Sequence, residues 1–194
     1  MRKNRKKRYI LGAVLLVAVM LAGIAVLLIH GKNAYMNSVY PLLYEEHIQA
    51  ASEATDITPS LIAAIICTES HFQPLVTSKA GAVGLMQLTP ETFLWAQKRA
   101  GVKQPLGEDA LFDPATNVYY GAYTLKLLFE QFKDEQTVLA AYNAGQGTVR
   151  KWIKDPKYSK DGVSLDEIPY AETAEYVKRV KTAQTIYRER YNLR

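Results

Sequence analysis

The 194-residue sequence contains little cysteine and little histidine, and each shortage excludes a class of site. One cysteine, Cys67, is too few for an intrachain disulfide, so a folded domain must be stabilised by its hydrophobic core. The three histidines form no His-Glu-x-x-His pair, and a single thiolate makes no zinc cluster. The sequence also lacks a calcium loop of alternating acidic residues and a phosphate-binding glycine loop with lysine. We therefore expect no metal and no cofactor.

Acidic residues are absent before Glu45, whereas six basic residues precede residue 9. These six account for the net charge of +5, because the chain from residue 31 onward has 18 basic and 19 acidic residues. A protein that binds nucleic acid is expected to keep a basic patch within its folded domain. The charge distribution therefore predicts no nucleic-acid partner.

A long apolar run, Ile10 to Ile29, contains no charged or strongly polar side chain. Its 20 residues match the roughly 20 that a helix needs to cross a ~30 Å hydrocarbon core. The alternative is a cleaved signal peptide, but the apolar part of such peptides is about 7 to 15 residues long. No convincing cleavage site with small residues lies between Leu27 and Asn33. The run is therefore interpreted as an uncleaved membrane anchor.

The basic residues before the apolar run favour a cytoplasmic N-terminus by the positive-inside rule. The sequence then predicts a single-pass protein of the cytoplasmic membrane, with its folded domain on the cell-wall side. The expected parts are a basic cytoplasmic tail at residues 1–9, a transmembrane anchor at 10–29, a linker at 30–38 and one domain at 39–194.

The remainder of the chain has the helix-start and helix-end signals of a mainly α domain. Three pairs place a capping side chain before a proline at the first helical position: Thr58-Pro59, Thr89-Pro90 and Asp113-Pro114. Further helices are expected at residues 39–53, 134–145, 147–154 and 172–190. Gly145 suits a left-handed cap at the end of one of them, and only residues 77–88 suggest a small hairpin.

Glu69 is the residue that points to chemistry. It follows Ile65 by four residues on the apolar stripe of the helix that starts at Pro59, so its carboxyl group should point inward. Burial raises the pKa of a carboxyl group, as a general acid near neutral pH requires. The alternative is a glutamate at a helix end that reaches solvent or pairs with a lysine.

Four motifs follow one another along the chain. They are Glu69-Ser70, the Gly-Leu-Met-Gln segment 84–87, the Ala-Tyr-Asn-Ala-Gly segment 141–145, and Ile168 to Thr173 followed by Tyr176-Val177. At these residues the sequence resembles the lytic transglycosylases of the soluble-lytic-transglycosylase type, which are relatives of goose-type lysozyme. Ala174 is a departure, since many members carry arginine there, and we expect it to affect a local ion pair.

The resemblance implies an α-rich, lysozyme-like domain with Glu69 in a cleft at the end of a central helix. It also implies cleavage of the β-1,4 bond between N-acetylmuramic acid and N-acetylglucosamine in peptidoglycan. Glu69 would act as general acid and then as general base, and the muramic C6 hydroxyl would close a 1,6-anhydro ring without consuming water.

The resemblance further implies a set of substrate-binding residues: Ser70, Gly84, Met86, Gln87, Tyr142, Asn143 and Tyr176. Several of these have a plainer structural reading. Ser70 is also a polar residue at a helix end, and Met86 is equally compatible with the core. Asn143 would serve to end its helix, and Tyr176 would be a core tyrosine with one satisfied hydroxyl.

Ordinary glycosidases use two placed carboxylates, so a partner for Glu69 matters. Asp113 is better explained as a helix cap, and Asp109 has no distinguishing context. Glu172 lies in a family motif near the start of the last helix, where a carboxylate also suits the helix dipole. We expect Glu172 to have a structural or indirect role.

Two other functions stay open on the sequence alone. One is a hydrolytic muramidase on the same fold, whose product would end in a reducing muramic acid. The other is a non-catalytic, peptidoglycan-binding scaffold of an envelope assembly. The expected partners are glycan strands, the membrane through residues 10–29, and envelope or secretion-assembly proteins.

Overall fold

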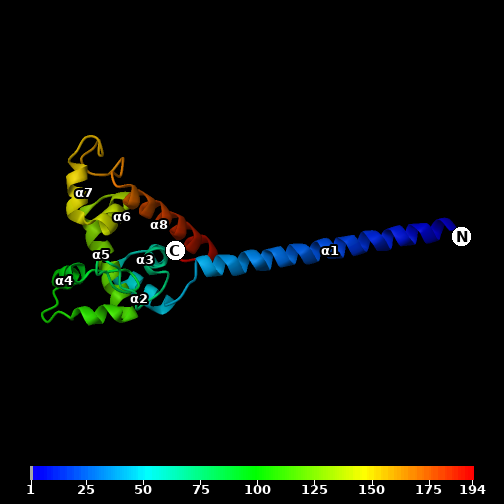
Figure 1. Cartoon of the computed structure of the whole chain (residues 1–194), viewed down its shortest axis with the longest axis horizontal. Helices are drawn as coiled ribbons and strands as arrows, with labels where there is room; N and C mark the ends of the chain where they lie inside the picture. Colours follow the sequence, from blue (N-terminus) through cyan, green and yellow to red (C-terminus); the bar gives the residue numbers. More distant parts are fainter. Residues whose placement is uncertain (1) are drawn as a thin grey trace. The chain divides into compact units, whose positions relative to one another are not determined.

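The computed structural model describes the backbone of residues 2–194 and the side chains of residues 16 and 18–194. Residue 1 and the side chains of residues 2–15 and 17, which belong to the predicted tail and anchor, lie outside this description. The chain forms two compact units, Met1–Pro41 and Leu42–Arg194 (Figure 1).

The first unit is the helix α1, Arg2–Val39. Within its described part, Ala18–Val39 is long and apolar enough to cross a membrane, as a signal sequence near an N-terminus would also be. The residues of the expected linker, 30–38, belong to this helix. The helix continues through these polar residues until Pro41, which has no N–H to donate.

The second unit is built from helices, as the sequence predicts. They are α2 Glu45–Thr55, α3 Pro59–Ser70, α4 Pro90–Arg99, the 3-10 helix η1 Glu108–Phe112, α5 Pro114–Gln131, α6 Glu135–Ala144, α7 Gln146–Ile153 and α8 Ala171–Arg190. The expected hairpin is reduced to two isolated bridges, Thr77 with Val83 and Val83 with Leu88. The helix expected at 39–53 begins only at Glu45, because Tyr44 has a left-handed backbone with φ 56°.

The helix starts follow the predicted caps in part. Thr89 accepts a hydrogen bond from the Thr92 N–H, and Asp113 accepts one from the Thr116 N–H. Thr58 precedes α3 as expected, but its side chain makes no capping bond. Gly145 has φ 85° and ψ 138°, so the predicted left-handed cap is wrong. Its carbonyl instead accepts the first hydrogen bonds of α7.

Helix α3 is the central helix of this unit. Its residues from Leu61 to Ile66 are at most 2% exposed, because α8 and α2 both pack against it. A helix that is apolar on nearly every side is stable only when its neighbours cover it. The burial of α3 places its C-terminal residue pair, Glu69 and Ser70, inside the fold.

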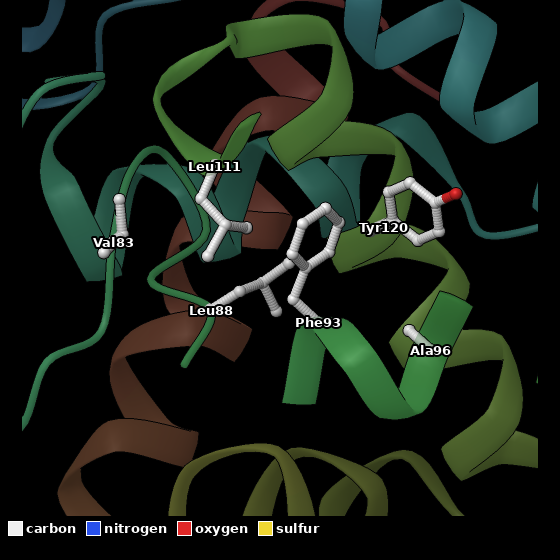
Figure 2. Close-up of a cluster of buried hydrophobic side chains, with 6 residues drawn as sticks. All are labelled: Val83, Leu88, Phe93, Ala96, Leu111 and Tyr120. Atoms are coloured by element: carbon white, nitrogen blue, oxygen red, sulfur yellow. The ribbon is translucent and has the colours of Figure 1, made fainter. Parts of the chain in front are cut away.

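A second group of buried side chains joins the glycine-rich segment, residues 81–87, to α4 and α5. Figure 2 shows its members: Val83, Leu88, Phe93, Ala96, Leu111 and Tyr120. The rings of Phe93 and Tyr120 meet edge to face, with centroids 5.0 Å apart. Such aromatic pairs contribute about 0.5–1.5 kcal/mol beyond their buried area. The cluster therefore fixes α4 against the segment that precedes it.

Gly121 of α5 should not tolerate a methyl group. A Cβ there would meet the Sδ, Cβ and Cε atoms of Met86. Overpacking of this kind costs about 1–3 kcal/mol, more than the roughly 1 kcal/mol that alanine adds to helix stability. We expect Gly121→Ala to lower the free energy of unfolding, measured by urea titration of the detergent-solubilised chain.

Gly147→Ala is the matched control, since nothing lies within 4 Å of a Cβ at that position of α7. Its stability should equal or slightly exceed that of the unmodified protein. Equal stabilities for the two variants would show that Met86 yields to the added methyl group.

Candidate active site

Glu69 occupies the last turn of α3 and lines a cleft of about 490 Å³. The other walls come from residues 80–92, from Trp95 of α4, from Thr124 and Leu128 of α5, and from residues 141–147. A larger cavity of about 770 Å³ lies at the opposite end of α3, around Thr58 and Ser60. It does not include Glu69, so the smaller cleft is the candidate active site.

The pKa of Glu69 is raised from 4.5 to about 7. Burial is the main cause, because a carboxylate loses its hydration there. The Tyr176 hydroxyl and the charge of Arg179 act in the opposite direction and lower this pKa. Near neutral pH the group therefore exists in both protonation states, which suits an acid that later serves as a base.

Two buried tyrosines accompany Glu69. Burial and then the negative charge of Glu69 raise the pKa values of Tyr142 and Tyr176, so both phenols keep their protons. The Tyr142 hydroxyl donates a hydrogen bond to the Met86 carbonyl oxygen, with 2.8 Å between the two oxygens. Among the described residues, the Tyr176 hydroxyl has no hydrogen bond of standard geometry, although it is buried beside Glu69. It is therefore available to donate to the carboxylate.

The glycine-rich segment is held by Asn117 of α5, which sequence reasoning missed. Its Nδ2 donates to the carbonyls of Val83 and Leu111 at 2.9 and 2.8 Å, and its Oδ1 accepts from the Met86 N–H at 2.8 Å. Gly84 has φ 80°, and a Cβ there would collide with Asn117 and the Leu111 carbonyl. The available signal was an amide on the buried face of a predicted helix.

Ser70 and Met86 face away from the cleft. The Ser70 hydroxyl is buried and donates to the Leu85 carbonyl at 2.8 Å. Met86 is 0% exposed and packs against Gly121. The structure therefore places both side chains where they position the glycine-rich segment, and Gly84 where it permits the turn.

Gln87, Asn143 and Tyr142 do line the cleft with Glu69. The Gln87 amide donates to the Gly84 carbonyl at 2.9 Å, which orients its side chain in a left-handed backbone position with φ 50°. Asn143 accepts a hydrogen bond from the Thr173 hydroxyl at 2.8 Å. This bond joins the end of α6 to the start of α8.

Glu172 is exposed in the first turn of α8 and is not among the described residues that line the cleft. The carboxylate that does share the cleft with Glu69 is Glu91 of α4, which sequence reasoning did not single out. Its neighbours Thr92 and Trp95 also line the cleft. Nothing in the local sequence separates them from an ordinary exposed helix face.

Removal of the Asn117 amide should destabilise the fold more than removal of a surface amide. Asn117→Ala leaves one buried N–H and two buried carbonyls without these partners, each at about 1–3 kcal/mol. We expect the free energy of unfolding to fall by about 3 kcal/mol or more in urea titration. Asn143→Ala, which removes one part-buried hydrogen bond, should lose about 1 kcal/mol. Equal losses would contradict this role of Asn117.

The raised pKa of Glu69 also predicts a pH dependence of stability. Ionisation is harder in the folded than in the unfolded chain, so stability should fall as pH rises from about 4.5 to about 7 and then level off. The pKa difference corresponds to about 3 kcal/mol. Glu69→Gln lacks this titration, so its stability relative to the unmodified protein should increase by that amount between pH 4 and pH 8.5. Parallel pH profiles in urea titrations would sink the prediction.

Comparison with known proteins places this geometry in a family. The family described as Transglycosylase SLT domain matches residues 46–163. The soluble lytic murein transglycosylase of Salmonella typhimurium strain LT2 is 34% identical over 156 residues, which are 79% of this chain and 24% of that protein. The membrane-bound lytic murein transglycosylase C of Shigella sonnei strain Ss046 is 30% identical over 167 residues, covering 74% of this chain and 46% of that protein.

Solved structures agree with the expected fold. An inactive glutamate-to-glutamine mutant of the lytic transglycosylase Slt from Pseudomonas aeruginosa matches 81% of this chain with a TM-score of 0.71 and 30% identity. The 70-kDa soluble lytic transglycosylase of Escherichia coli matches 77% with a TM-score of 0.69 and 33% identity. The chain spans 26% and 25% of those proteins, and about a quarter of its soluble curated relatives. The lysozyme-like fold is confirmed, and the chain belongs to the Transglycosylase SLT domain family.

Proposed function

We propose that this protein is a peptidoglycan lytic transglycosylase in which Glu69 is the catalytic acid and base. The bond cleaved is the β-1,4 bond between N-acetylmuramic acid and N-acetylglucosamine. The observation that carries the proposal is a buried carboxyl group with a pKa of about 7 in a cleft built from the family's motifs. The relatives named lytic murein transglycosylases support the reaction class.

In the first step, protonated Glu69 donates its proton to the leaving glycosidic oxygen. The bond from that oxygen to C1 of the muramic acid breaks, and positive charge develops at C1. The new Glu69 carboxylate is stabilised by the Tyr176 hydroxyl and by the charge of Arg179, which both favour the ionised form. Glu69 is then ready to accept a proton.

In the second step, the Glu69 carboxylate takes the proton of the muramic C6 hydroxyl. The C6 oxygen forms a bond to C1 and closes the 1,6-anhydro ring, and Glu69 returns to its protonated form. A hydrolase would need a second carboxylate at about 5–9.5 Å to act as nucleophile or to activate water. The relatives named lytic murein transglycosylases favour ring closure over the hydrolytic muramidase.

For substrate recognition, we assign direct contacts to Gln87, Tyr142 and Asn143, which line the cleft. Tyr176, which is not among the described residues that line the cleft, positions the Glu69 carboxyl group through its hydroxyl. The structure-forming side chains Ser70, Gly84 and Met86 hold the segment that carries Gln87. The exposed residue Glu172 has no part in this proposal for the chemistry.

We also propose that α1 anchors the enzyme in the cytoplasmic membrane through residues 10–29. The apolar helix and the membrane-bound relative from Shigella support anchoring. The basic residues before residue 9 favour a cytoplasmic N-terminus. The catalytic domain would then act on glycan strands near the membrane, where envelope or secretion-assembly proteins are its natural partners.

The test is mass spectrometry of the products that the full chain, purified in detergent, releases from isolated peptidoglycan. We expect 1,6-anhydromuramic ends from the unmodified protein and a rate at least about 100-fold lower from Glu69→Gln, because the proton donor is lost. Glu53→Gln changes an exposed carboxylate on α2 and should act like the unmodified protein.

Each other outcome assigns a different function. Products with reducing muramic ends would identify a hydrolytic muramidase. Tight binding to peptidoglycan with no product from any of the three proteins would identify a non-catalytic scaffold. Full activity of Glu69→Gln would refute the assigned acid.

A further inference from the structure

The α4 wall of the cleft carries two side chains that the chemistry above does not use. Glu91 and Trp95 both line the cleft that contains Glu69. They are four residues apart on α4, so they lie on the same face of the helix with Cβ atoms about 5–6 Å apart. Together they form a wall with one flat ring and one carboxylate.

Trp95 is half-buried and has two environments. Part of its surface packs against the cluster that contains Phe93, and part lines the cleft. Packing of this kind holds the ring in place before a ligand arrives, so little side-chain freedom is lost on binding. A flat, amphipathic ring in a glycan cleft suits contact with the face of a pyranose.

The charge of Glu91 is not neutralised within the described part of the chain. The ion pairs there join Arg99 with Glu130 and Lys178 with Glu175, and neither involves Glu91. The described residues that line the cleft include no lysine or arginine. Glu91 is also exposed in the first turn of α4. The cleft therefore offers a carboxylate to a cationic ligand group.

Glu91 lines the cleft without shifting the pKa of Glu69. The groups that shift the pKa of Glu69 are Tyr176 and Arg179, and Glu91 is not among them. A carboxylate in direct contact with Glu69 would raise that pKa further. Glu91 therefore lines the cleft without direct contact with the Glu69 carboxyl group.

We propose that Glu91 and Trp95 form a subsite for a glucosamine residue that lacks its N-acetyl group. The indole of Trp95 would cover the sugar face, and the Glu91 carboxylate would accept hydrogen bonds from the 2-ammonium group. The subsite rests on the proposed function, because it takes a glycan strand as the ligand. Peptide stems also carry ammonium groups, but the indole one turn away favours an amino group borne by a sugar ring.

The binding test uses the full chain in detergent with Glu69→Gln, so that no substrate is consumed. Calorimetry at pH 6 compares a hexamer of glucosamine with a hexamer of N-acetylglucosamine. We expect the glucosamine hexamer to bind about tenfold more tightly at low salt, as one charge-assisted hydrogen bond allows. The preference for the glucosamine hexamer should be lost when Glu91→Gln is combined with Glu69→Gln, and also when 1 M NaCl is present.

Glu46→Gln is the matched control, because Glu46 has the same second position in α2 that Glu91 has in α4 and is exposed outside the cleft. It should keep the preference. Equal affinity for the two hexamers, or a preference that survives Glu91→Gln, would overturn the subsite.

Trp95 supplies a separate readout, since the chain has two tryptophans and Trp152→Phe leaves Trp95 alone. We expect the glucosamine hexamer to change the fluorescence of that variant, with half of the change at the calorimetric Kd. Thermal unfolding checks that the variant is folded. Unchanged fluorescence at saturating hexamer would contradict contact between the ring and the sugar.

Cleavage of peptide-free glycan strands separates this inference from the proposed function. We expect kcat/KM for partly deacetylated strands to exceed that for fully acetylated strands, through a lower KM, only while Glu91 is present. Preferred binding without any cleavage would retain the subsite and overturn the proposed function. Equal cleavage of both kinds of strand, with equal affinity for the two hexamers, would retain the proposed function and overturn the subsite. A preference seen only on strands with peptide stems would reject the sugar assignment.

Discussion

The site depends on one constraint, which is that the carboxyl group of Glu69 is kept out of water at the end of a buried helix. The apolar surface of α3 brings α2 and α8 around it, and this packing encloses the last turn as well. The loss of hydration raises the pKa of Glu69 to about 7. The same packing therefore builds the core and gives the acid the pKa that its proposed chemistry needs.

The backbone of Met86 links α5 to Tyr142, the tyrosine beside Glu69. The Met86 N–H is bound by Asn117, and its carbonyl is bound by Tyr142. Asn117 thus fixes the segment whose carbonyl orients the Tyr142 hydroxyl beside Glu69. Because Asn117 is buried and Tyr142 is partly buried, a small shift of the segment would break several hydrogen bonds that water could not fully replace. The glycine-rich segment behaves as part of the scaffold, although it has almost no regular structure.

Features that depend on neighbours in sequence could be predicted, whereas those that depend on distant segments could not. The start of α5 follows from Asp113 and Pro114, and the inward position of Glu69 follows from helical spacing. Asn117 was missed because its partners Val83 and Met86 lie more than 30 residues away. Met86 was ambiguous for the same reason, since the space that buries it exists only because Gly121 faces it. The helical structure of residues 30–38 was not predicted, because polar residues can continue a helix until a proline stops it.

The α3 and α4 walls of the cleft have different proposed roles, proton transfer by Glu69 and sugar binding by Glu91 and Trp95. Glu69 needs an environment of low polarity, because a nearby carboxylate would raise its pKa further, whereas a nearby cation lowers it, as Arg179 does. Glu91, in contrast, lies at an exposed helix start and is not among the groups that shift the pKa of Glu69. The Phe93 cluster fixes α4, and with it Glu91 and Trp95, against the glycine-rich segment and α5, so the proposed charge recognition and the proposed proton transfer take place on different helices, α4 and α3.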